Sequence, residues 1–430
     1  MNVPSHGPGV ALASFLACIA CGGEDAGGPV VLRISDSGLG AENQVLVRQL
    51  GRFMEENPDI RVEIQVTPDA ADQRHQLYVQ WLNARADDPD ILAIDVVWTP
   101  EFAAAGWILP LDRFAPPANR FFAATIEANT WRGNLFALPW FADVGMLYWR
   151  TDLIDSAPST LEELARQSTD AMQRAGVPYG FVWQGARYEG LVTVFLEHLG
   201  GFGGEILDAE GHVVVDSEES VRALTYMRDA IHERRNVPRS VLTWHEEEAR
   251  FAFQNGQAVF MRNWPYAYPL LEDSTRSRVA GRFAIAPMPA ATGVGAPTAA
   301  LGGAQLAINA NTQDPDAAFA VVEYLTRPEQ MLERARVVGQ YPTRPALYED
   351  PGLADALGIP TEPILRIIER AAPRPVTPVY TELSQLLQVR LHRALTGQQE
   401  PAAALKAAAA QIRALLQRVG LEPEAPVASN

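Results

Sequence analysis

Two aromatic side chains, Trp264 and Tyr266, stand directly after a short apolar run in residues 248–268, EARFAFQNGQAVFMRNWPYAY. Pro265 lies between them and restricts the backbone of the turn that carries both rings. Rings on such a turn can stack on a flat apolar face of a ligand, and each ring also carries a polar group. The alternative is that both rings only cover the core beneath the preceding strand, since aromatic side chains dominate protein cores.

Two carboxylates lie where a charge needs partners. Asp95 is embedded in ILAIDVVW at 91–98, a near-continuous β-branched run that is typical of a central parallel strand. Because an unpaired charge is costly in such a strand, Asp95 must form a buried ion pair, act as a cap or bind a ligand. Asp143 follows Trp140 and Phe141 at a predicted hinge, and the same alternatives apply to it.

Several patterns begin like catalytic motifs but lack a required feature. Residues 245–248, HEEE, begin like a zinc-protease helix, but Ala249 stands where the second histidine is required. The glycine-rich segment at 200–204 follows a predicted helix, so it is not a dinucleotide fingerprint. Asp95 and Asp143 could form the carboxylate pair of a glycoside hydrolase, yet no further sequence sign indicates a tuned acid–base pair. We expect no catalytic residue, no metal site and no cofactor.

The elements around these residues alternate between strand and helix. Apolar patterns predict strands at 30–35, 61–66 and 91–98, with helices at 43–56 and 73–85 between them. This order is typical of a doubly wound α/β lobe. Ligands of such lobes tend to bind at the mouth of the sheet, which is where a helix–glycine–strand unit would place the aromatic turn.

Three segments are candidate crossings between two lobes. Residues 141–144, 287–300 and 340–345 each combine proline, glycine or a short loop with the end of an element, as hinges commonly do. A length of 430 residues is also too great for one small core. The sequence therefore predicts two α/β lobes around a cleft.

The charge balance excludes some partners. Acidic residues outnumber basic ones 52 to 35, which gives a formal net charge of -17. Nucleic acid and an electrostatic membrane-surface role both require a basic surface, so neither is expected.

The two cysteines, Cys18 and Cys21, lie near the start of the chain, so the rest has no disulfide or cysteine metal site. An apolar run at 10–20, too short to span a bilayer, resembles a lipoprotein signal. It implies a signal peptide at 1–21, a lipidated Cys21 and a glycine-rich tether at 22–29. Cys18 fits less well because the tether follows Cys21, and the lack of Lys or Arg upstream is a departure. A redox pair in CIAC is the other interpretation, but no strand–helix context precedes it.

Six collinear segments resemble the family 1 extracellular solute-binding proteins of ABC importers, and most closely the trehalose/maltose-binding type. They are IDVVWTPEFAAAGWILPLD (94–112), LPWFADVGMLYWRTDL (138–153), YGFVWQGARYEGLV (179–192), FQNGQAVFMRNWPYAY (253–268), LGGAQLAI (301–308) and APRPVTPVYTELS (372–384). The resemblance spans residues 30–419 and implies an α/β, two-lobed periplasmic-binding-protein-like fold of type II. The ligand cleft would lie between lobes that several crossover segments join.

The resemblance and the candidate crossings together divide the chain. The prediction is an N-terminal lobe of 30–142 and 299–341, a C-terminal lobe of 143–298 and 342–422, and a tail of 423–430. The implied protein is an extracytoplasmic, lipid-anchored monomer that captures a sugar by lobe closure and delivers it to the transmembrane subunits of an ABC permease. The sugar would be a disaccharide such as trehalose or maltose. Another solute, or a sensor role for the same fold, is the alternative.

A sugar site needs carboxylates and arginines for hydroxyl groups, and aromatic rings for the flat C–H faces. With Tyr266 from the aromatic turn, the candidate ligand-binding residues that the resemblance implies are Glu42, Arg74, Asp95, Asp143, Trp264, Tyr266, Gly303, Arg374 and Tyr380. Gly303 would let the backbone approach the ligand closely. A solvated helix end is the alternative for Glu42 and Arg74, and a rigid proline-rich surface turn for Arg374 and Tyr380.

Two positions depart from the trehalose/maltose type. Ala304 stands where that type usually has a tryptophan after the glycine pair, and Phe141 replaces a tyrosine. A stacking ring and a hydroxyl contact are therefore missing, so the ligand need not be trehalose or maltose.

Overall fold

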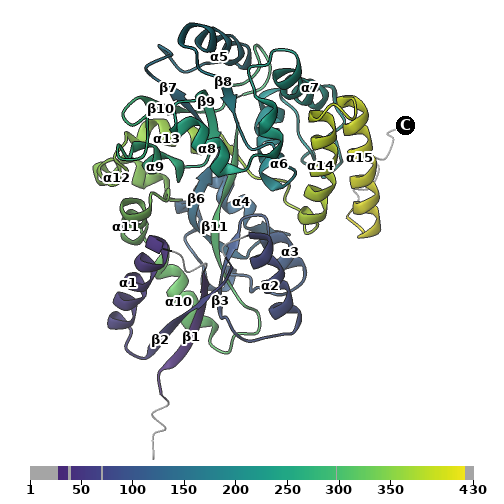
Figure 1. The fold of residues 1–430 in the computed structure, drawn as a ribbon. Coiled ribbons are helices and arrows are strands. Elements are labelled where there is room, and N and C mark those ends of the chain that lie inside the picture. The colour runs from purple at the N-terminus through teal and green to yellow at the C-terminus, as the bar shows by residue number, and fades with distance from the viewer. Residues whose placement is uncertain (1–27, 37–39, 69–70, 297, 422–430) are drawn as a thin grey trace, which may run out of the picture.

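The computed structural model describes residues 28–36, 40–68, 71–296 and 298–421. Two separate sheets organise this part of the chain, and helices pack around each of them (Figure 1). Cys18, Cys21, the predicted signal peptide and the tail at 423–430 lie outside the described residues. No described helix has the length and apolar character that crossing a membrane requires.

The first sheet has six strands in the order β12-β11-β3-β1-β2, with β6 paired to the other side of β11. The strands are β1 (Val30–Asp36), β2 (Ile60–Val66), β3 (Ile91–Asp95), β6 (Ala137–Val144), β11 (Ala299–Ile308) and β12 (Ala371–Ala372). β1 is parallel to β2 and β3, whereas β11 is antiparallel to both β3 and β6. Because β1 and β3 are parallel, their last residues, Asp36 and Asp95, lie at the same edge of the sheet.

The helices that belong to the first sheet follow the predicted alternation with strands. They are α1 (Gly40–Glu56), α2 (Ala71–Asn83), α3 (Thr99–Ala104), α4 (Ala123–Ala128), α10 (Pro315–Leu325) and α11 (Pro328–Val338). Two short 3-10 helices, η1 (Asp112–Phe114) and η2 (Ala118–Arg120), and a hairpin of β4 (Thr130–Trp131) and β5 (Asn134–Leu135) complete this part. Proline in the first turn of α10 and of α11 suits a position where no backbone donor is needed.

The second sheet has four strands in the order β10-β7-β9-β8. They are β7 (Met146–Arg150), β8 (Tyr179–Val182), β9 (Ala258–Asn263) and β10 (Phe283–Ala286). The helices around it are α5 (Leu161–Ala175), α6 (Glu189–Gly201), α7 (Glu218–His232), α8 (Glu246–Gln254), α9 (Ala267–Glu272), α12 (Pro351–Leu357), α13 (Thr361–Ile368), α14 (Tyr380–Leu395) and α15 (Pro401–Arg418), with the 3-10 turns η3 (Arg239–Thr243) and η4 (Pro345–Glu349). All six residues of β9 are buried, as its apolar run predicts.

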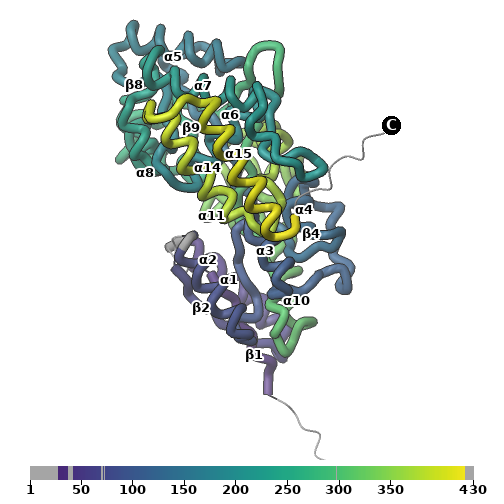
Figure 2. Tube along the Cα trace, turned by 90° about the vertical axis from the view of Figure 1, so that its right-hand side faces the viewer, coloured from purple at the N-terminus to yellow at the C-terminus, as the bar shows by residue number. Residues whose placement is uncertain are grey.

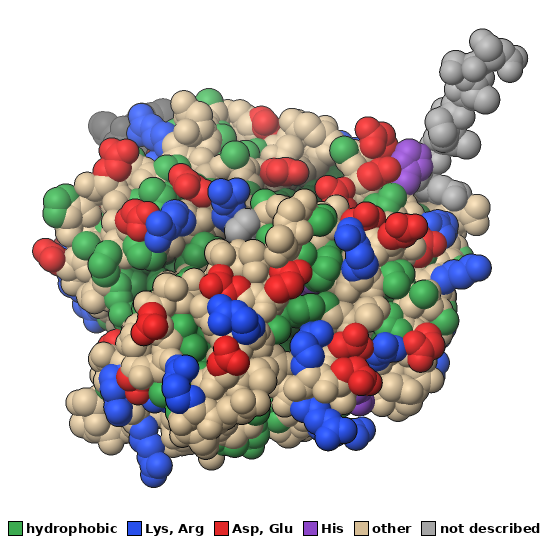
Figure 3. All heavy atoms as spheres, turned by 90° about the horizontal axis from the view of Figure 1, so that it is seen from above, with side chains coloured by type: hydrophobic (Ala, Val, Ile, Leu, Met, Phe, Trp, Pro, Cys, Tyr) green, Lys and Arg blue, Asp and Glu red, His purple; other side chains and the backbone are tan. Residues whose placement is uncertain are grey.

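Helices α14 and α15 pack side by side along the outside of the second sheet (Figure 2). Their apolar residues join the cluster around α6 and α7, which includes Leu387, Leu391 and Ile412. On the face seen in Figure 3, acidic and basic side chains are interspersed with apolar ones. The described residues of that face therefore form no continuous basic surface.

The chain passes between the sheets at short segments. It leaves the first sheet at Gly145, between β6 and β7, and returns through 287–298, between β10 and β11. It leaves again after α11, through 339–344. A Cβ on Gly145 would overlap the buried carboxylate of Glu197, so the first of these crossings requires glycine.

The strand predicted at 91–98 is shorter than expected, because β3 ends at Asp95. Asp95 Oδ1 accepts a hydrogen bond from the backbone N–H of Val97 at 3.1 Å, which turns the chain away from the sheet. Thr99 then begins α3. The aspartate thus lies at the end of its strand and not inside it, with its side chain partly exposed.

Candidate functional site

Strand β11 pairs with β3 on one side and with β6 on the other, and β6 and β11 extend from the first sheet towards the second (Figure 1). Ala304 of β11 is paired with Asp95 on one side and with Phe141 on the other. Gly302 is paired with Asp143. The two aspartates therefore approach the same short stretch of β11 from opposite sides.

Asp143 lies among other carboxylates. Burial is the main cause that raises its pKa to about 7, and the nearby charges of Glu42 and Asp95 act in the same direction. No hydrogen bond from a described residue contributes to the pKa of the Asp143 carboxylate. Glu42 and Asp95 are thus close enough to Asp143 to repel its charge, and among the described residues no donor stabilises the charged form of Asp143.

Trp264 approaches the Asp143 side chain from the second sheet. It follows β9 on the predicted turn, and its side chain is partly exposed. A Cβ placed on Gly302 would lie 3.5 Å from Cζ3 of Trp264 and 3.4 Å from Cβ of Asp143. The indole ring and Cβ of Asp143 therefore both lie next to the position that a side chain at Gly302 would occupy.

The indole of Trp264 is held by three contacts. The guanidinium carbon of Arg262 lies 3.9 Å from the ring centroid, over one face. The indole Nε1 donates to Glu246 at 3.4 Å, and the backbone carbonyl accepts from the hydroxyl of Tyr148 at 2.7 Å. Arg262 is itself fixed by an ion pair with Glu197, and both side chains are fully buried. The ring is therefore held in place by the protein itself.

Tyr266 is fixed in a similar way. Its hydroxyl donates to Glu247 at 2.7 Å, and burial together with that carboxylate raises the pKa of the phenol. Glu246 and Glu247 both belong to the HEEE segment at the start of α8. The glutamates that made this segment look like the beginning of a zinc motif thus hold the two aromatic rings.

Arg374 and Tyr380 are buried, which rules out the surface-turn interpretation of the proline-rich segment. Arg374 donates to Asp95 at 3.0 Å and to Glu189 at 2.9 Å. Burial opposes the guanidinium charge, but Asp95, Tyr380 and Glu189 outweigh it and raise the pKa of Arg374. The hydroxyl of Tyr380 donates to Glu189 at 2.5 Å. Arg374 thus contacts a further predicted site residue, Asp95, and its guanidinium carbon lies 5.8 Å from the ring centroid of Tyr380.

Gly303 has a structural requirement of its own. Its φ is +107°, and a Cβ there would overlap the backbone carbonyl of Phe141. The backbone that approaches Gly303 closely is therefore that of β6, and its predicted approach to a ligand stays a prediction.

Glu42 and Arg74 come from the helices beside the first sheet. Glu42 lies in the first turn of α1, and its charge acts on Asp143. The guanidinium carbon of Arg74 lies 5.6 Å from the ring centroid of Trp98, and Nη1 donates to the carbonyl of Pro68 at 3.1 Å. Trp98 belongs to the turn that follows Asp95, so Arg74 is placed beside that turn.

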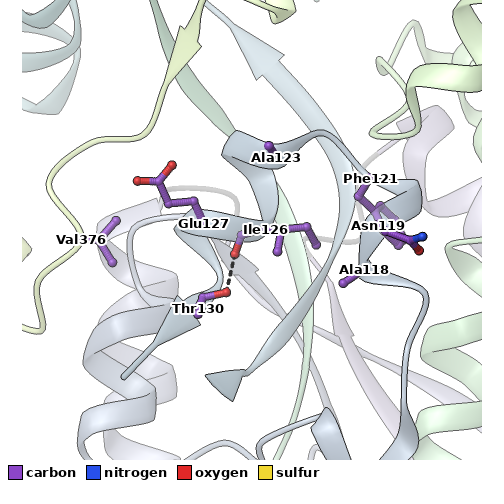
Figure 4. Close-up of a pocket in the computed structure, with 8 residues that line it drawn as sticks. All are labelled: Ala118, Asn119, Phe121, Ala123, Ile126, Glu127, Thr130 and Val376. Atoms are coloured by element: carbon purple, nitrogen blue, oxygen red, sulfur yellow. Dashed lines mark hydrogen bonds between the residues drawn. The ribbon is translucent and has the colours of Figure 1, made fainter. Parts of the chain in front are cut away.

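Two surface cavities lie apart from the Asp143–Trp264 pair. One of about 720 Å³ is bordered by η2 and α4, with Val376 opposite Ala118 and Phe121 (Figure 4). The other, of about 830 Å³, lies between Trp131, residues 203–211 and residues 372–377. Asp143 and Trp264 line neither cavity, whereas Arg374 lines the second.

Within the described residues, one group of side chains has the composition of a metal site. Asp208, Glu210 and His212 place three ligand atoms within 4.8 Å of one another on an exposed loop. His212 Nδ1 lies 3.0 Å from Asp208 Oδ2, so a hydrogen bond accounts for the closeness of two of them. We assign no metal to this loop.

The fold and the site together define a class of protein. Two α/β units are joined by short crossing segments, and carboxylates from one sheet meet an aromatic ring from the other. This is the arrangement of binding proteins that enclose a solute between two lobes.

Comparisons with known proteins agree with this class. The family of bacterial extracellular solute-binding proteins matches residues 39–332, and the chain belongs to that family. A probable ABC transporter-binding protein of Deinococcus radiodurans is 36% identical over 366 residues, which cover 82% of this chain and 86% of that protein. The maltose-bound structure of MalE3 from T. maritima is 42% identical, with a TM-score of 0.80, over 90% of this chain and 100% of that one. The unliganded and acarbose-bound GacH receptor of Streptomyces glaucescens shares the fold, with a TM-score of 0.78 at 22% identity, over 90% of this chain and 99% of that one.

These findings confirm the predicted family and the two-lobed fold. Membership also places the protein outside the cytoplasm. Sequence reasoning missed Glu189, Glu197, Glu246 and Glu247, which hold the site residues in place. Glu189 belongs to the segment at 179–192 and Glu246 to the HEEE segment, but neither local pattern indicates the partner of its glutamate.

Proposed function

We propose that the protein captures a neutral sugar for an ABC importer and releases it to the transmembrane permease subunits. The observation that carries this proposal is the pairing of Asp143 with Trp264 across Gly302. A carboxylate without a protein donor accepts hydrogen bonds from hydroxyl groups, and an adjacent indole stacks on the C–H face of a pyranose ring. Together they match the two kinds of surface that a sugar presents.

The charges around the pair favour a neutral, hydroxyl-rich ligand over an anionic one. Glu42, Asp95 and Asp143 are all acceptors in their ionised form. An acidic sugar would add a further negative charge to this group and would be repelled. A disaccharide such as maltose or trehalose is the substrate that we propose, and maltose is the ligand named for MalE3.

The proposed mechanism is closure. The lobes at 30–142 with 299–341 and at 143–298 with 342–422 rotate about the crossing segments, and a sugar that contacts both stabilises the closed state. A ligand that touched one lobe alone would bind without shifting this equilibrium. In this proposal the closed monomer docks on the permease, and Cys21 carries the lipid that keeps the protein at the membrane.

We propose no catalytic role for the carboxylates. A glycoside hydrolase needs one carboxyl group to donate a proton and another to act as base or nucleophile. The raised pKa of Asp143 would suit an acid. Asp95, however, is engaged by Arg374 and by the backbone of Val97, which lowers its value as a base.

The test is isothermal titration of the mature protein with trehalose, maltose, sucrose, maltotriose and glucose, with tryptophan fluorescence in parallel. The proposal predicts saturable binding to at least one of them and a spectral change that Trp264→Ala abolishes. If none of the five sugars bound, the result would favour another solute or a sensor role. Slow release of monosaccharide would instead favour the hydrolase.

A further inference from the structure

Glu189, the first residue of α6, collects three hydrogen-bond donors from separate places in the chain. Arg374 donates through Nη1 at 2.9 Å, Tyr380 through its hydroxyl at 2.5 Å, and Ser384 through its hydroxyl group. A carboxylate at the first turn of a helix is also favoured by the helix dipole. The side chain of Glu189 is therefore fixed from several directions, although about a third of its surface is exposed.

Arg374 continues this network to the other sheet. Its Nη2 donates to Asp95 Oδ1 at 3.0 Å, so one guanidinium connects the end of β3 with the start of α6. The arginine side chain is 5% exposed, whereas Asp95 is 27% exposed. Of these two side chains, Asp95 therefore offers most of the surface that a ligand could contact. Arg374 is buried next to it and donates to its carboxylate.

The carboxylate of Glu189 determines how the guanidinium of Arg374 is oriented. A guanidinium beside a single carboxylate tends to form two parallel hydrogen bonds with it. Such a fork would take one lone pair on each oxygen of Asp95 and reduce its capacity to accept from a sugar hydroxyl. With Glu189 engaging Nη1, a single bond from Nη2 reaches Asp95 and only Oδ1 is taken by the arginine.

We propose that Glu189 is a positioning residue for the sugar site. It holds Arg374 in the orientation that leaves one oxygen of Asp95 available to a ligand hydroxyl, and it does not itself contact the sugar. This inference rests on the proposed function and deepens it. Tyr380 also acts through Glu189 in this arrangement.

The test is a double-mutant cycle of Glu189→Gln and Arg374→Met, with affinities for maltose and for trehalose measured by isothermal titration. Glutamine keeps the size and hydrogen-bonding capacity of the side chain but loses the charge that holds the guanidinium. We expect Glu189→Gln to weaken binding about tenfold in the wild type, the size of a lost hydrogen bond between charged groups. In the Arg374→Met background the same substitution should change affinity less than about twofold, because residues that act as a unit are not additive.

Matched variants separate positioning from general damage to the fold. Asp216→Asn removes another ion pair of the second-sheet region, with Arg413 at 2.8 Å, and should leave affinity unchanged. Ser384→Ala removes one of the three donors to Glu189 and should destabilise the fold less than Glu189→Gln does. It should weaken binding by about twofold to threefold in the wild type, and this effect should also disappear in the Arg374→Met background. Thermal melting of every variant shows whether the fold is retained.

The outcomes are distinct. Equal losses from Glu189→Gln in both backgrounds, or no loss in either, would overturn the positioning role and leave the proposed function standing. A wild-type protein that bound neither sugar would overturn the maltose or trehalose assignment, and this inference with it.

Discussion

The two sheets contribute to the site in opposite ways. The first sheet brings Asp95 and Asp143 together with Glu42, and burial together with the charges of Glu42 and Asp95 raises the pKa of Asp143 to about 7. The second sheet brings Trp264 and Tyr266, and contacts with Arg262 and with glutamates of α8 hold both rings. On the first side, no described residue donates a hydrogen bond to the carboxylate of Asp143, whereas the rings on the other side are already held by the protein.

This difference indicates how the work of binding is divided. Rings that are fixed beforehand lose little freedom when a ligand arrives, which improves affinity. A carboxylate that is unstable in the empty protein gains most when a ligand supplies donors. We therefore expect substitutions on the two sides to differ in their effect on the stability of the sugar-free protein.

The largest expected effect concerns β11, which lies between the two sides. Gly303→Ala should destabilise the protein by about 3 kcal/mol or more, because the new Cβ meets the Phe141 carbonyl at a φ that favours glycine. Gly302→Ala is the matched control, since its Cβ meets only ordinary contacts with Asp143 and Trp264. Thermal melting should show a large loss for the first variant and a small one for the second. Equal losses would show that the backbone at Gly303 is not constrained.

On the organised side, Trp264→Ala should weaken sugar binding about 30-fold or more, as expected for a truncated central aromatic contact. The melting temperature should change little, because Arg262 keeps its buried partner Glu197. Isothermal titration and melting measure the two quantities. If affinity were unchanged both in this variant and in Asp143→Ala, the site would lie elsewhere.

On the charged side, Asp143→Asn should weaken binding about tenfold, since a charge-assisted hydrogen bond is lost. The same substitution should stabilise the sugar-free protein. A pKa raised from 3.8 to about 7 means that the folded state binds a proton that the unfolded state has released, so wild-type stability falls as pH rises through this window. The gain in melting temperature should therefore be larger at about pH 8 than at about pH 5. If the gain in melting temperature were the same at both pH values, the titration of Asp143 could not be its cause.

A smaller effect follows for binding itself. Sugar hydroxyls that donate to Asp143 favour its charged form, so affinity should rise with pH up to the pKa of about 7 and then level off. Near neutral pH, binding should release a proton. Titrations in two buffers of different ionisation enthalpy detect this release, and the Asp143→Asn variant is the control. Proton uptake on binding would reverse the assigned role of Asp143.

The smallest expected effect is that of Glu246→Gln. Its hydrogen bond with Trp264 is long, at 3.4 Å, and Arg262 still covers the ring. Affinity should fall by about threefold at most, within the range of a neutral hydrogen bond. A loss as large as that of Trp264→Ala would mean that Glu246 itself contacts the ligand.

Local patterns in the sequence were enough to predict β1, β2, β9 and the aromatic turn, but not β11, which pairs with the strands of both aspartates. The apolar run before Trp264 forms β9, and the alternation at 30–66 forms β1, α1 and β2. The end of β3 could not be predicted, because Val96, Val97 and Trp98 continue the β-branched run beyond it. The hydrogen bond from Val97 to Asp95 ends the strand instead.

The residues that hold the site were beyond sequence reasoning for a different reason. Glu189 and Arg374 are 185 positions apart, and Glu197 and Arg262 are 65 apart. Nothing in the local pattern of either member indicates its partner, since the fold alone brings them together. Gly303 shows the converse: a close approach of the backbone to a ligand is predicted there and stays a prediction, whereas the approach that requires glycine in the structure is that of the Phe141 carbonyl.

Small-angle X-ray scattering of the protein, with and without the sugar that it binds, tests most directly whether the two lobes close when a ligand contacts both of them. The account predicts that saturating sugar reduces the radius of gyration of the wild type, because contacts with both sheets stabilise the closed state. Saturation of the wild type without any change in scattering would contradict this claim.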